Sequence, residues 1–468
     1  MWQNSEDAKQ LGAMVKRRDF LGKLSLGIGG MALTNLMGSE VEQQIAHYAP
    51  KAKRVIFLCM AGGPSHLETF DYKPELAKFH GKLMPESFTK GQPIAQLQGK
   101  PLTCYGPQTG FKRYGKSGIL VSDFLPHIGS VADDICVIKS MVTEQINHDP
   151  AHTFLNTGSA ISGRPSMGSW VNYGLGSLSN NLPGFVVLTS KSGRNPQPIA
   201  SRQWASGCLP SKFQGVEFNA KGAPVHYVDN PGGITDARQR QVIEAVKKMD
   251  QLRDMQVHDQ EIDSKIAQYE MAFRMQSSVP DLLDISDEPK SVLEEYGASV
   301  GAGSYASNCL LARRLAERGV RFIQLYHKGW DHHGGLKKFM GVSCGSTDQP
   351  TAALIKDLKR RGMLEDTLVI WGGEFGRTPM AQGSGRDHHI KGYSMFMAGG
   401  GVKGGITHGE TDDLGYNSVK DIVPVRDLHA TMLHQLGLDH HKFSTKFQGL
   451  DTRLTGVKPA QVVKKILS

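Results

Sequence analysis

The feature that most constrains the fold of this chain is a series of short apolar runs, several of which end in glycine-rich loops. The runs that we interpret as buried strands span residues 54–60, 135–138, 185–189, 320–326, 367–371 and 393–398. Helical patterns occupy residues 305–318, 351–361 and 425–436. Strands that alternate with helices of this length are typical of a largely parallel sheet covered on both faces. We therefore predict an α/β fold, a three-layer α/β/α sandwich.

The composition excludes several classes of protein. Of the 468 residues, 39% are apolar and 21% are charged, which excludes a mostly disordered chain. No stretch has the roughly 18 uncharged apolar residues of a spanning helix, so we exclude a polytopic membrane protein. The net charge is +9, but no basic stripe with interleaved aromatic residues concentrates it, and we expect no nucleic-acid partner.

The first 46 residues carry the pattern of an export signal. Paired arginines at positions 17 and 18 precede Phe-Leu and a lysine, and a weakly apolar, glycine-rich run follows. This order matches a bacterial twin-arginine signal. We expect residues 1–46 to be a signal peptide read by the twin-arginine translocase, and the mature protein to be periplasmic or extracellular. A small-x-small cleavage site is missing, so a retained N-terminal membrane anchor stays open.

The remainder of the chain is predicted to be one large domain. We place this domain at residues 47–455, followed by a short basic C-terminal tail at 456–468. Residues 236–278 are highly charged and helical in pattern with few turn signals, so we expect a helical hairpin there. The whole helical insertion is placed near residues 236–300.

Histidines and carboxylates gather in loops at the ends of these strands. These residues are His66, His148, His152, Asp331, His332, His333, Glu374, His388 and His389. Because the carboxyl ends of parallel strands share one edge of a sheet, we expect the loops to converge. Imidazole and carboxylate together suit Zn, Mn or Fe near neutral pH, so we predict a metal site. His440 and His441 follow the last helix, and we leave them out of this set.

Two features of these loops leave alternatives open. Adjacent side chains in an extended loop point to opposite faces. One histidine of each pair is therefore expected to bind the metal and the other to support it or face solvent. Arg377 follows Glu374 in a glycine-flanked turn. Its guanidinium suits a planar anion such as phosphate, sulfate or carboxylate, or it forms a salt bridge to Glu374.

Taken together, these segments resemble a known family. The leader and the segments MAGGPSHLETFD, NHDPAHTFLNTGS, GWDHH, GGEFGRTP, GRDHH and AGGGVKGG are similar to those of exported, sulfatase-like bacterial proteins of the alkaline phosphatase superfamily. The resemblance covers roughly residues 54–454. It implies an alkaline phosphatase/sulfatase-like sandwich with a large, mostly parallel sheet, and descent from metal-assisted ester hydrolases.

The resemblance also implies roles for single residues. On the sulfatase segment Cys-x-Pro-Ser-Arg-x-x-Leu-x-Thr-Gly, His148 falls at the nucleophile position and His152 at the arginine position. The positions that match are Pro150, Leu155, Thr157 and Gly158. Glu374 stands where the superfamily has a metal-binding Asp. His388 or His389 matches a later histidine ligand.

This sequence departs from the superfamily pattern at two points. The first strand ends in Ala61-Gly62-Gly63 rather than in a metal-binding Asp, and the nucleophile position holds histidine. Both departures count against a two-metal site with a covalent intermediate. A one-metal site in which an activated water attacks directly needs no protein nucleophile. Ser65 and Thr153 remain as alternative nucleophiles.

We therefore predict an exported metal-dependent hydrolase of a sulfate or phosphate ester, borne by a small molecule or a glycan. His148 or His152 would act as general acid/base and Arg377 would bind the oxyanion. The divalent ion, Zn, Mn or Ca, is expected on Asp331, His333, Glu374 and His389, with His66, His332 and His388 as further candidates. The alternative is a non-catalytic exported protein that binds an anion or a glycan on the same fold.

Overall fold

The computed structural model describes residues 46–92, 94–197, 199–219 and 260–468, with single residues between 235 and 248. These residues belong to a unit that spans 45–468, and residues 1–44 form a separate unit. The predicted signal peptide thus lies outside the described residues. Within the described residues, no helix has both the length and the apolar character needed to cross a membrane.

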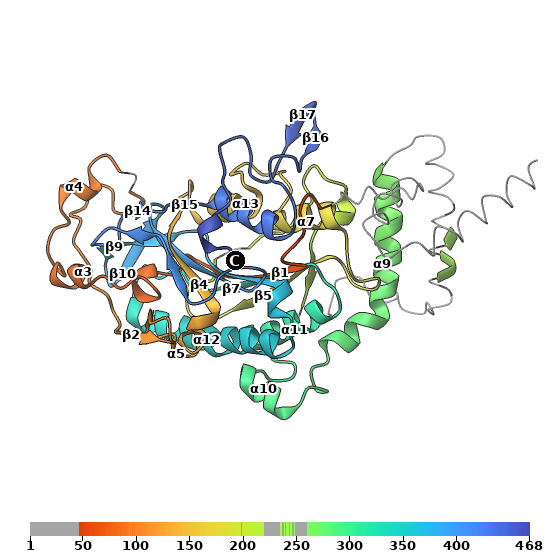
Figure 1. Ribbon diagram of the computed structural model, residues 1–468, viewed down its shortest axis with the longest axis horizontal. Helices are drawn as coiled ribbons and strands as arrows, with labels where there is room; N and C mark the ends of the chain where they lie inside the picture. Colours follow the sequence, from red (N-terminus) through yellow and green to blue (C-terminus); the bar gives the residue numbers. More distant parts are fainter. Residues whose placement is uncertain are drawn as a thin grey trace, which may run out of the picture. The chain divides into compact units, whose positions relative to one another are not determined.

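A sheet forms the centre of the described unit (Figure 1). Its strand order is β12-β4-β11-β8-β1-β7-β5-β6, and β15 also pairs with β4. The strands are β1 (Arg54–Ala61), β4 (Ile135–Val142), β5 (Phe185–Lys191), β6 (Val216–Phe218), β7 (Phe322–Lys328), β8 (Thr367–Gly372), β11 (Tyr393–Ala398), β12 (Ile406–His408) and β15 (Val423–Pro424). Only β11 runs antiparallel to its neighbours in this sheet. The mostly parallel sheet confirms the predicted fold class.

Helices cover both faces of this sheet, and β1 shows why. Ile56, Leu58 and Met60 pack in the core under α11 (Tyr305–Glu317) and α12 (Leu336–Arg360). The alternate residues of the strand pack in the core under α6 (His148–Thr157), α7 (Met167–Leu175) and α13 (Val425–Gln435). In Figure 1, α7 and α13 lie on one side of the sheet and α11 and α12 on the other. Burial on both faces makes the strand read as an unbroken apolar run.

Two helical segments differ from the sequence prediction. The segment NHDPAH, predicted to be a loop, begins helix α6 at His148. Pro150 is compatible with this start because the first turn of a helix needs no backbone N–H donor. Helix α12 begins at Leu336, well before the predicted residue 351, and contains Pro350. Gly341 and Gly345 lower the helix propensity of its first half, which hid that half in the sequence.

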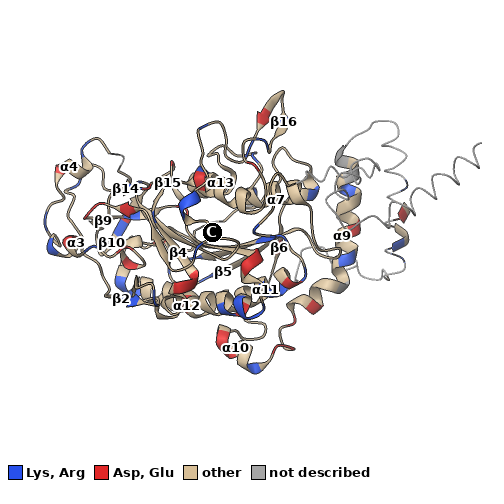
Figure 2. Cartoon of the chain, viewed as in Figure 1, with Lys and Arg blue, Asp and Glu red and all other residues tan. Residues whose placement is uncertain are grey.

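The predicted helical insertion is described only in part. Its described elements are α9 (Gln260–Leu283) and α10 (Lys290–Tyr296), and most of residues 220–259 lie outside the described residues, so the expected hairpin stays a prediction. Basic and acidic residues intersperse along α10, α11 and α12 (Figure 2). In α11, Arg313 forms an ion pair of 2.6 Å with Glu288, which ties the segment before α10 to this helix.

Smaller elements complete the unit. They are α3 (Pro74–Lys78), α4 (Glu86–Thr89), α5 (Pro126–Gly129), β2 (Phe111–Tyr114), β3 (Ile119–Ser122), β9 (Gly376–Gln382), β10 (Gly385–His389), β13 (Glu410–Thr411), β14 (Ser418–Lys420), β16 (Thr445–Phe447) and β17 (Leu450–Thr452). Met380 of β9 shares a small core with Leu76 of α3, which fixes the β9–β10 hairpin. The tail packs on this same unit, because Leu467 forms a bridge to Val402.

Candidate metal centre

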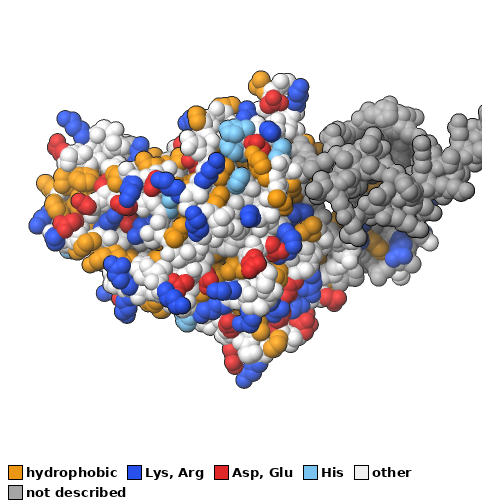
Figure 3. Space-filling view, viewed as in Figure 1, with side chains coloured by type: hydrophobic (Ala, Val, Ile, Leu, Met, Phe, Trp, Pro, Cys, Tyr) orange, Lys and Arg blue, Asp and Glu red, His pale blue; other side chains and the backbone are white. Residues whose placement is uncertain are grey.

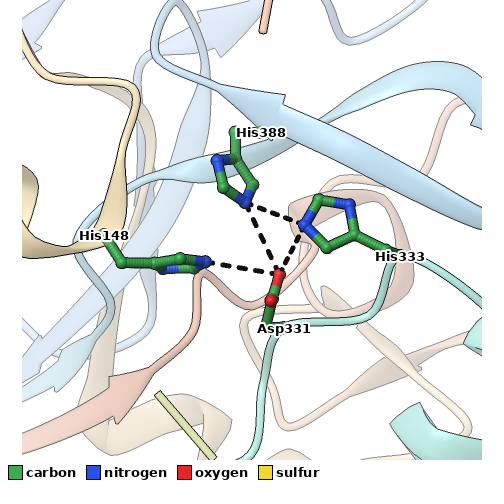
Figure 4. A group of neighbouring side chains, drawn as sticks. All are labelled: His148, Asp331, His333 and His388. Carbon is green, nitrogen blue, oxygen red and sulfur yellow. Dashed lines mark hydrogen bonds and ion pairs between the residues drawn. The ribbon is translucent and has the colours of Figure 1, made fainter. Parts of the chain in front are cut away.

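Four side chains from three parts of the chain converge at the carboxyl edge of the sheet. His148 begins α6 after β4, Asp331 and His333 follow β7, and His388 lies on β10. One ligand atom from each residue lies within 4.8 Å of the other three. Figure 4 shows the three imidazoles and the carboxylate directed toward one another. The parallel arrangement of β4 and β7 brings these distant segments together, as expected for strand-end loops.

The spacing of these atoms is that of ligands around one ion. Oδ1 of Asp331 lies 3.3 Å from Nε2 of His148, 2.9 Å from Nε2 of His333 and 3.5 Å from Nε2 of His388. The Nε2 atoms of His333 and His388 are 2.9 Å apart. Ligands at about 2.0–2.1 Å from a tetrahedral zinc ion stand about 3.3 Å apart. The four residues therefore fit a single divalent ion.

The second nitrogen of each imidazole is held by an acceptor. Nδ1 of His148 donates to Oε1 of Glu374 over 2.6 Å, and Nδ1 of His388 donates to the carbonyl of Ile146 over 2.8 Å. Nδ1 of His333 bonds to Oε1 of Gln382. Each proton therefore sits on Nδ1, and each Nε2 lone pair faces the centre, which is the arrangement of metal-binding histidines. Nε2 of His148 is buried without a hydrogen-bond partner.

Asp331 is fixed through both carboxylate oxygens. Its Oδ1 accepts from Nη2 of Arg377 over 2.7 Å, and its Oδ2 accepts from Nε2 of Gln197 over 2.7 Å. Burial alone would raise the pKa of Asp331. The three histidines around Oδ1 and the charge of Arg377 outweigh burial and hold this pKa well below its ordinary value. The group is therefore an ionised carboxylate with one oxygen directed at the centre.

Glu374 lies behind His148 rather than among the four converging residues. It is fully buried. Besides His148, its carboxylate accepts from the backbone N–H groups of Gly62 at 3.0 Å and Gly63 at 3.2 Å, and Nε2 of His152 lies 3.3 Å away. Burial opposes its ionisation, but the nearby His152 and His148 prevail and lower its pKa to about 2. Glu374 was expected as a metal ligand; in the structure its carboxylate holds Nδ1 of His148 instead of pointing to the centre.

The glycines that end β1 allow the loops to meet. Gly62 has φ +126°, and a Cβ on it would stand 2.5 Å from the backbone nitrogen of Asp331. Gly63 has φ +71°, and its Cβ would stand 2.6 Å from the ring of Phe375. Only glycine accepts this backbone and this contact. Glycine rather than aspartate therefore stands at these two positions for a steric reason.

Arg377 faces inward and does not present its guanidinium to solvent. Its side chain is 1% exposed and donates to the carbonyls of Gly62, Gly63 and Arg386 as well as to Asp331. It was expected to bind a substrate oxyanion. In the structure its donors hold the loop after β1 and the carboxylate of Asp331 in place.

Three other expected ligands point away from the centre. Nε2 of His332 lies 3.3 Å from Oγ of Ser343 in α12, His389 bonds to the carbonyl of Tyr416, and Nε2 of His66 lies 2.9 Å from the carbonyl of Gly415. Burial lowers the pKa of His332 and of His389 to about 3. His388 and His389 alternate because they are neighbours on strand β10. From the expected metal set the structure brings together Asp331, His333 and His388.

His148 and His152, expected to act as acid and base, also occupy different places. His148 completes the cluster of converging ligand atoms. His152 lies one helical turn further along α6 and is fully buried beside Glu374. Sequence reasoning missed Gln197 and Gln382, because glutamine is common in ordinary loops and surface strands. It also missed the Ile146 carbonyl, which has no sequence signature.

Comparisons with known proteins place the chain by sequence family. A search of curated proteins finds no match. Among solved structures, the chain is similar to Ps i-CgsB in complex with k-i-k-neocarrahexaose, at 10% identity over 83% of this chain and 72% of that chain, with a TM-score of 0.36. It is similar to the PsFucS1 sulfatase from Pseudoalteromonas sp., at 11% identity over 83% and 68%, with a TM-score of 0.34.

A protein in the alkaline phosphatase superfamily from Vibrio parahaemolyticus gives 11% identity over 88% of this chain and 70% of that chain, with a TM-score of 0.33. These similarities are too low to carry a conclusion about activity. The family model described as "Protein of unknown function (DUF1501)" matches residues 52–467. The chain therefore belongs to the DUF1501 family.

Proposed function

We propose that this protein is a metal-dependent hydrolase of a sulfate or phosphate ester, with one divalent ion on His148, Asp331, His333 and His388. The observation that carries the proposal is the convergence of three Nε2 atoms and one carboxylate oxygen, with every Nδ1 held by an acceptor. A divalent ion held there lowers the pKa of a coordinated water and so supplies a nucleophile near neutral pH. The choice of ester rests on the sequence motifs.

The residues around the four ligands have separate tasks in this proposal. Glu374 keeps the proton of His148 on Nδ1. His152 lies beside Glu374, with its Nε2 3.3 Å from the carboxylate. Arg377 and Gln197 hold the carboxylate of Asp331 so that one oxygen faces the centre. The side chain of His333 is 20% exposed, so the ester is expected to approach from the side of this ring.

The ester oxyanion needs a cation, and Arg377 is too deeply buried to supply it. Arg202 forms an ion pair with Asp149, the residue that follows His148, and its side chain is 42% exposed. We infer that Arg202 contacts the oxyanion of the bound ester. A guanidinium suits this task because it donates two parallel hydrogen bonds to sulfate or phosphate oxygens.

The same geometry also favours a second candidate function, a non-catalytic binding protein. A tetrahedral ion with four protein ligands has no open position, as in structural zinc sites. Such a protein would bind an anion or a glycan without turnover. Catalysis would instead require room for a water beside these four residues, next to the partly exposed ring of His333. In either case we propose export by the twin-arginine route, on the pattern of residues 1–46.

Metal analysis combined with a substrate panel separates these functions. We expect one divalent ion per chain in the wild type, its loss in His333→Asn, and its retention in His332→Asn, the matched neighbour that points to α12. Aryl sulfate and aryl phosphate are then assayed with the wild type before and after chelation. Turnover that disappears with the ion supports the hydrolase. Bound ion with no turnover of either ester supports the binding protein. A wild type that binds no divalent ion refutes both.

A further inference from the structure

A second site lies apart from the metal centre, in a cavity of about 760 Å³. Its walls are the end of α13, strands β12 and β15, and residues 460–465 of the tail. Its lining includes four histidines, His408, His434, His440 and His441. Histidine side chains gather near the top of the view in Figure 3. None of the four residues of the metal centre lines this cavity.

Two of these imidazole side chains are largely buried and form no hydrogen bond with any residue that the structure describes. His408 is 7% exposed and His440 is 6% exposed. Among the described residues neither side chain has a hydrogen-bond partner, although the ring of His440 lies 3.9 Å from that of His441. The ring nitrogens of both residues are not enclosed by protein. They open onto the cavity, where a ligand with complementary polar atoms can reach them.

The acidic groups of the cavity already have partners. Asp421 pairs with Lys465, and Asp439 accepts from the hydroxyl of Tyr48 over 2.7 Å. Oδ1 of Asp427 accepts from the backbone N–H of residue 461 over 2.9 Å. Lys464, by contrast, lines the cavity without an ion pair to any residue in the described ranges. Lys464 and the N–H groups of the imidazoles therefore remain as donors for a ligand.

The surroundings of the histidines make their protonation depend on whether an anion is bound. Burial lowers the pKa of His408 and of His440, and burial with Lys464 lowers the pKa of His434. Asp421 and Lys465 act on His408 in opposite directions. The charged groups that act on His440 are Asp439, His434, His441 and Arg453. The lowered pKa values of His408, His434 and His440 favour their neutral forms near pH 7, and a bound anion favours the charged forms.

We propose that this cavity binds the oxyanion group of a small molecule, a sulfate, phosphate or carboxylate, through its histidines, His408 and His440 among them, and more tightly as the pH falls. The volume is that of a small-molecule site, typically about 300–1,000 Å³, so the ligand extends beyond the anionic group. The site is independent of the proposed hydrolase activity, because it shares no residue with the metal centre.

The test is calorimetric titration of the full chain with inorganic sulfate at pH 5.5 and pH 8.0. Sulfate keeps its charge over this range, so a change in affinity reports on the protein. We expect an affinity at least about tenfold higher at pH 5.5, since binding is linked to proton uptake by two histidines. His408→Asn/His440→Asn should remove this gain. His127→Asn, an exposed histidine on α5, should keep it, and so should Asp331→Asn, which alters the metal centre.

Two further measurements test the site independently of the double variant. Lys464→Ala changes an exposed residue and should weaken sulfate binding several-fold even if the double variant does not fold. Dextran sulfate replaces inorganic sulfate in the second measurement. A much higher affinity for the polymer indicates that the bound oxyanion group belongs to an anionic chain. Equal affinity per sulfate indicates that it belongs to a free small molecule. Absence of binding at pH 5.5, equal affinity at both pH values, or binding unchanged in both pocket variants would overturn the proposal.

Discussion

Replacing Glu374 by glutamine tests whether the metal centre depends on a buried carboxylate that is not one of the four converging residues. Glu374 accepts hydrogen bonds from Nδ1 of His148 and from the backbone N–H groups of Gly62 and Gly63. Glutamine has one carbonyl oxygen in place of two carboxylate oxygens. In either orientation its NH₂ group meets a donor, at His148 or at the glycines. At least one buried donor is then left without an acceptor.

The expected magnitudes follow from these contacts. A buried donor without an acceptor costs about 1–3 kcal/mol of unfolding free energy. Loss of the anionic partner of a ligand histidine weakens metal binding by about 10–100-fold, which corresponds to about 1.4–2.7 kcal/mol. We expect Glu374→Gln to show both effects. The affinity for the ion should fall because His148 loses the acceptor that fixes its tautomer.

The assay measures the metal dissociation constant by competition with a chromogenic chelator, and the unfolding free energy in urea. Glu68→Gln is the matched control. Glu68 is also fully buried, and it pairs with Arg386 at 2.7 Å without contacting any of the four converging residues. We expect Glu68→Gln to lose stability but to keep its metal affinity within about threefold, since the change is remote from the ligands. Wild-type metal affinity in Glu374→Gln, or an equal loss in both variants, would refute the reasoning.

Three further outcomes are expected. Gly62→Ala should lose about 1–3 kcal/mol of stability and most of its metal in elemental analysis, because the new Cβ would stand 2.5 Å from the backbone of Asp331. Arg202→Ala should lower kcat/KM for the ester about tenfold or more while the metal content stays at one. Burial lowers the pKa of His327 to about 3, so the unfolded chain takes up this proton first as the pH falls. The contribution of His327 to the unfolding free energy is therefore fully present above about pH 6.5. Between that pH and pH 3 it is lost by about 1.4 kcal/mol per pH unit. Urea unfolding at pH 7 and pH 5 should therefore show a smaller pH effect in His327→Asn.

The fold could be predicted because its strands are buried on both faces. A strand covered on both sides needs an unbroken apolar run, and such runs are visible in any single sequence. Helix starts were harder to recognise. The first turn of α6 contains Pro150, a residue that suggests a loop, although a first turn tolerates it. His148 was predicted to be a general acid or base because it falls at the nucleophile position of the sulfatase segment, and so it was not among the predicted ligands.

The sequence predicts which loops form the site, because the topology of the sheet determines which loops meet. Parallel strands bring their loops to one edge, so residues after β7 and the hairpin beyond β8 were expected to meet. Which histidine of a pair faces the centre depends on the register of β10, and register is set by neighbours far away in the chain. The ring of His333 lies between Gln382, which bonds to its Nδ1, and His388, whose Nε2 is 2.9 Å from its Nε2. Contacts of this kind join residues with no common sequence pattern.

The segment GRDHH shows how the remaining charged residues of these loops are used. Arg386 binds the buried carboxylate of Glu68, Asp387 accepts from the backbone N–H groups of residues 96 and 97, and His389 holds the carbonyl of Tyr416. Only His388 faces the centre.

The other residues of the segment therefore fix β10 from several directions, which a ligand requires if it is to stay within about 0.5 Å of its productive position. Most charged residues in these loops hold the backbone in position, and few face the centre. The degree of burial distinguishes the two roles. Fully buried Arg377 and Arg386 serve the scaffold, whereas the side chains of His333 and Arg202 are partly exposed, and Arg202 pairs with Asp149 next to His148. The substrate chemistry should therefore be sought beside these partly exposed side chains rather than among the motif residues with the highest charge.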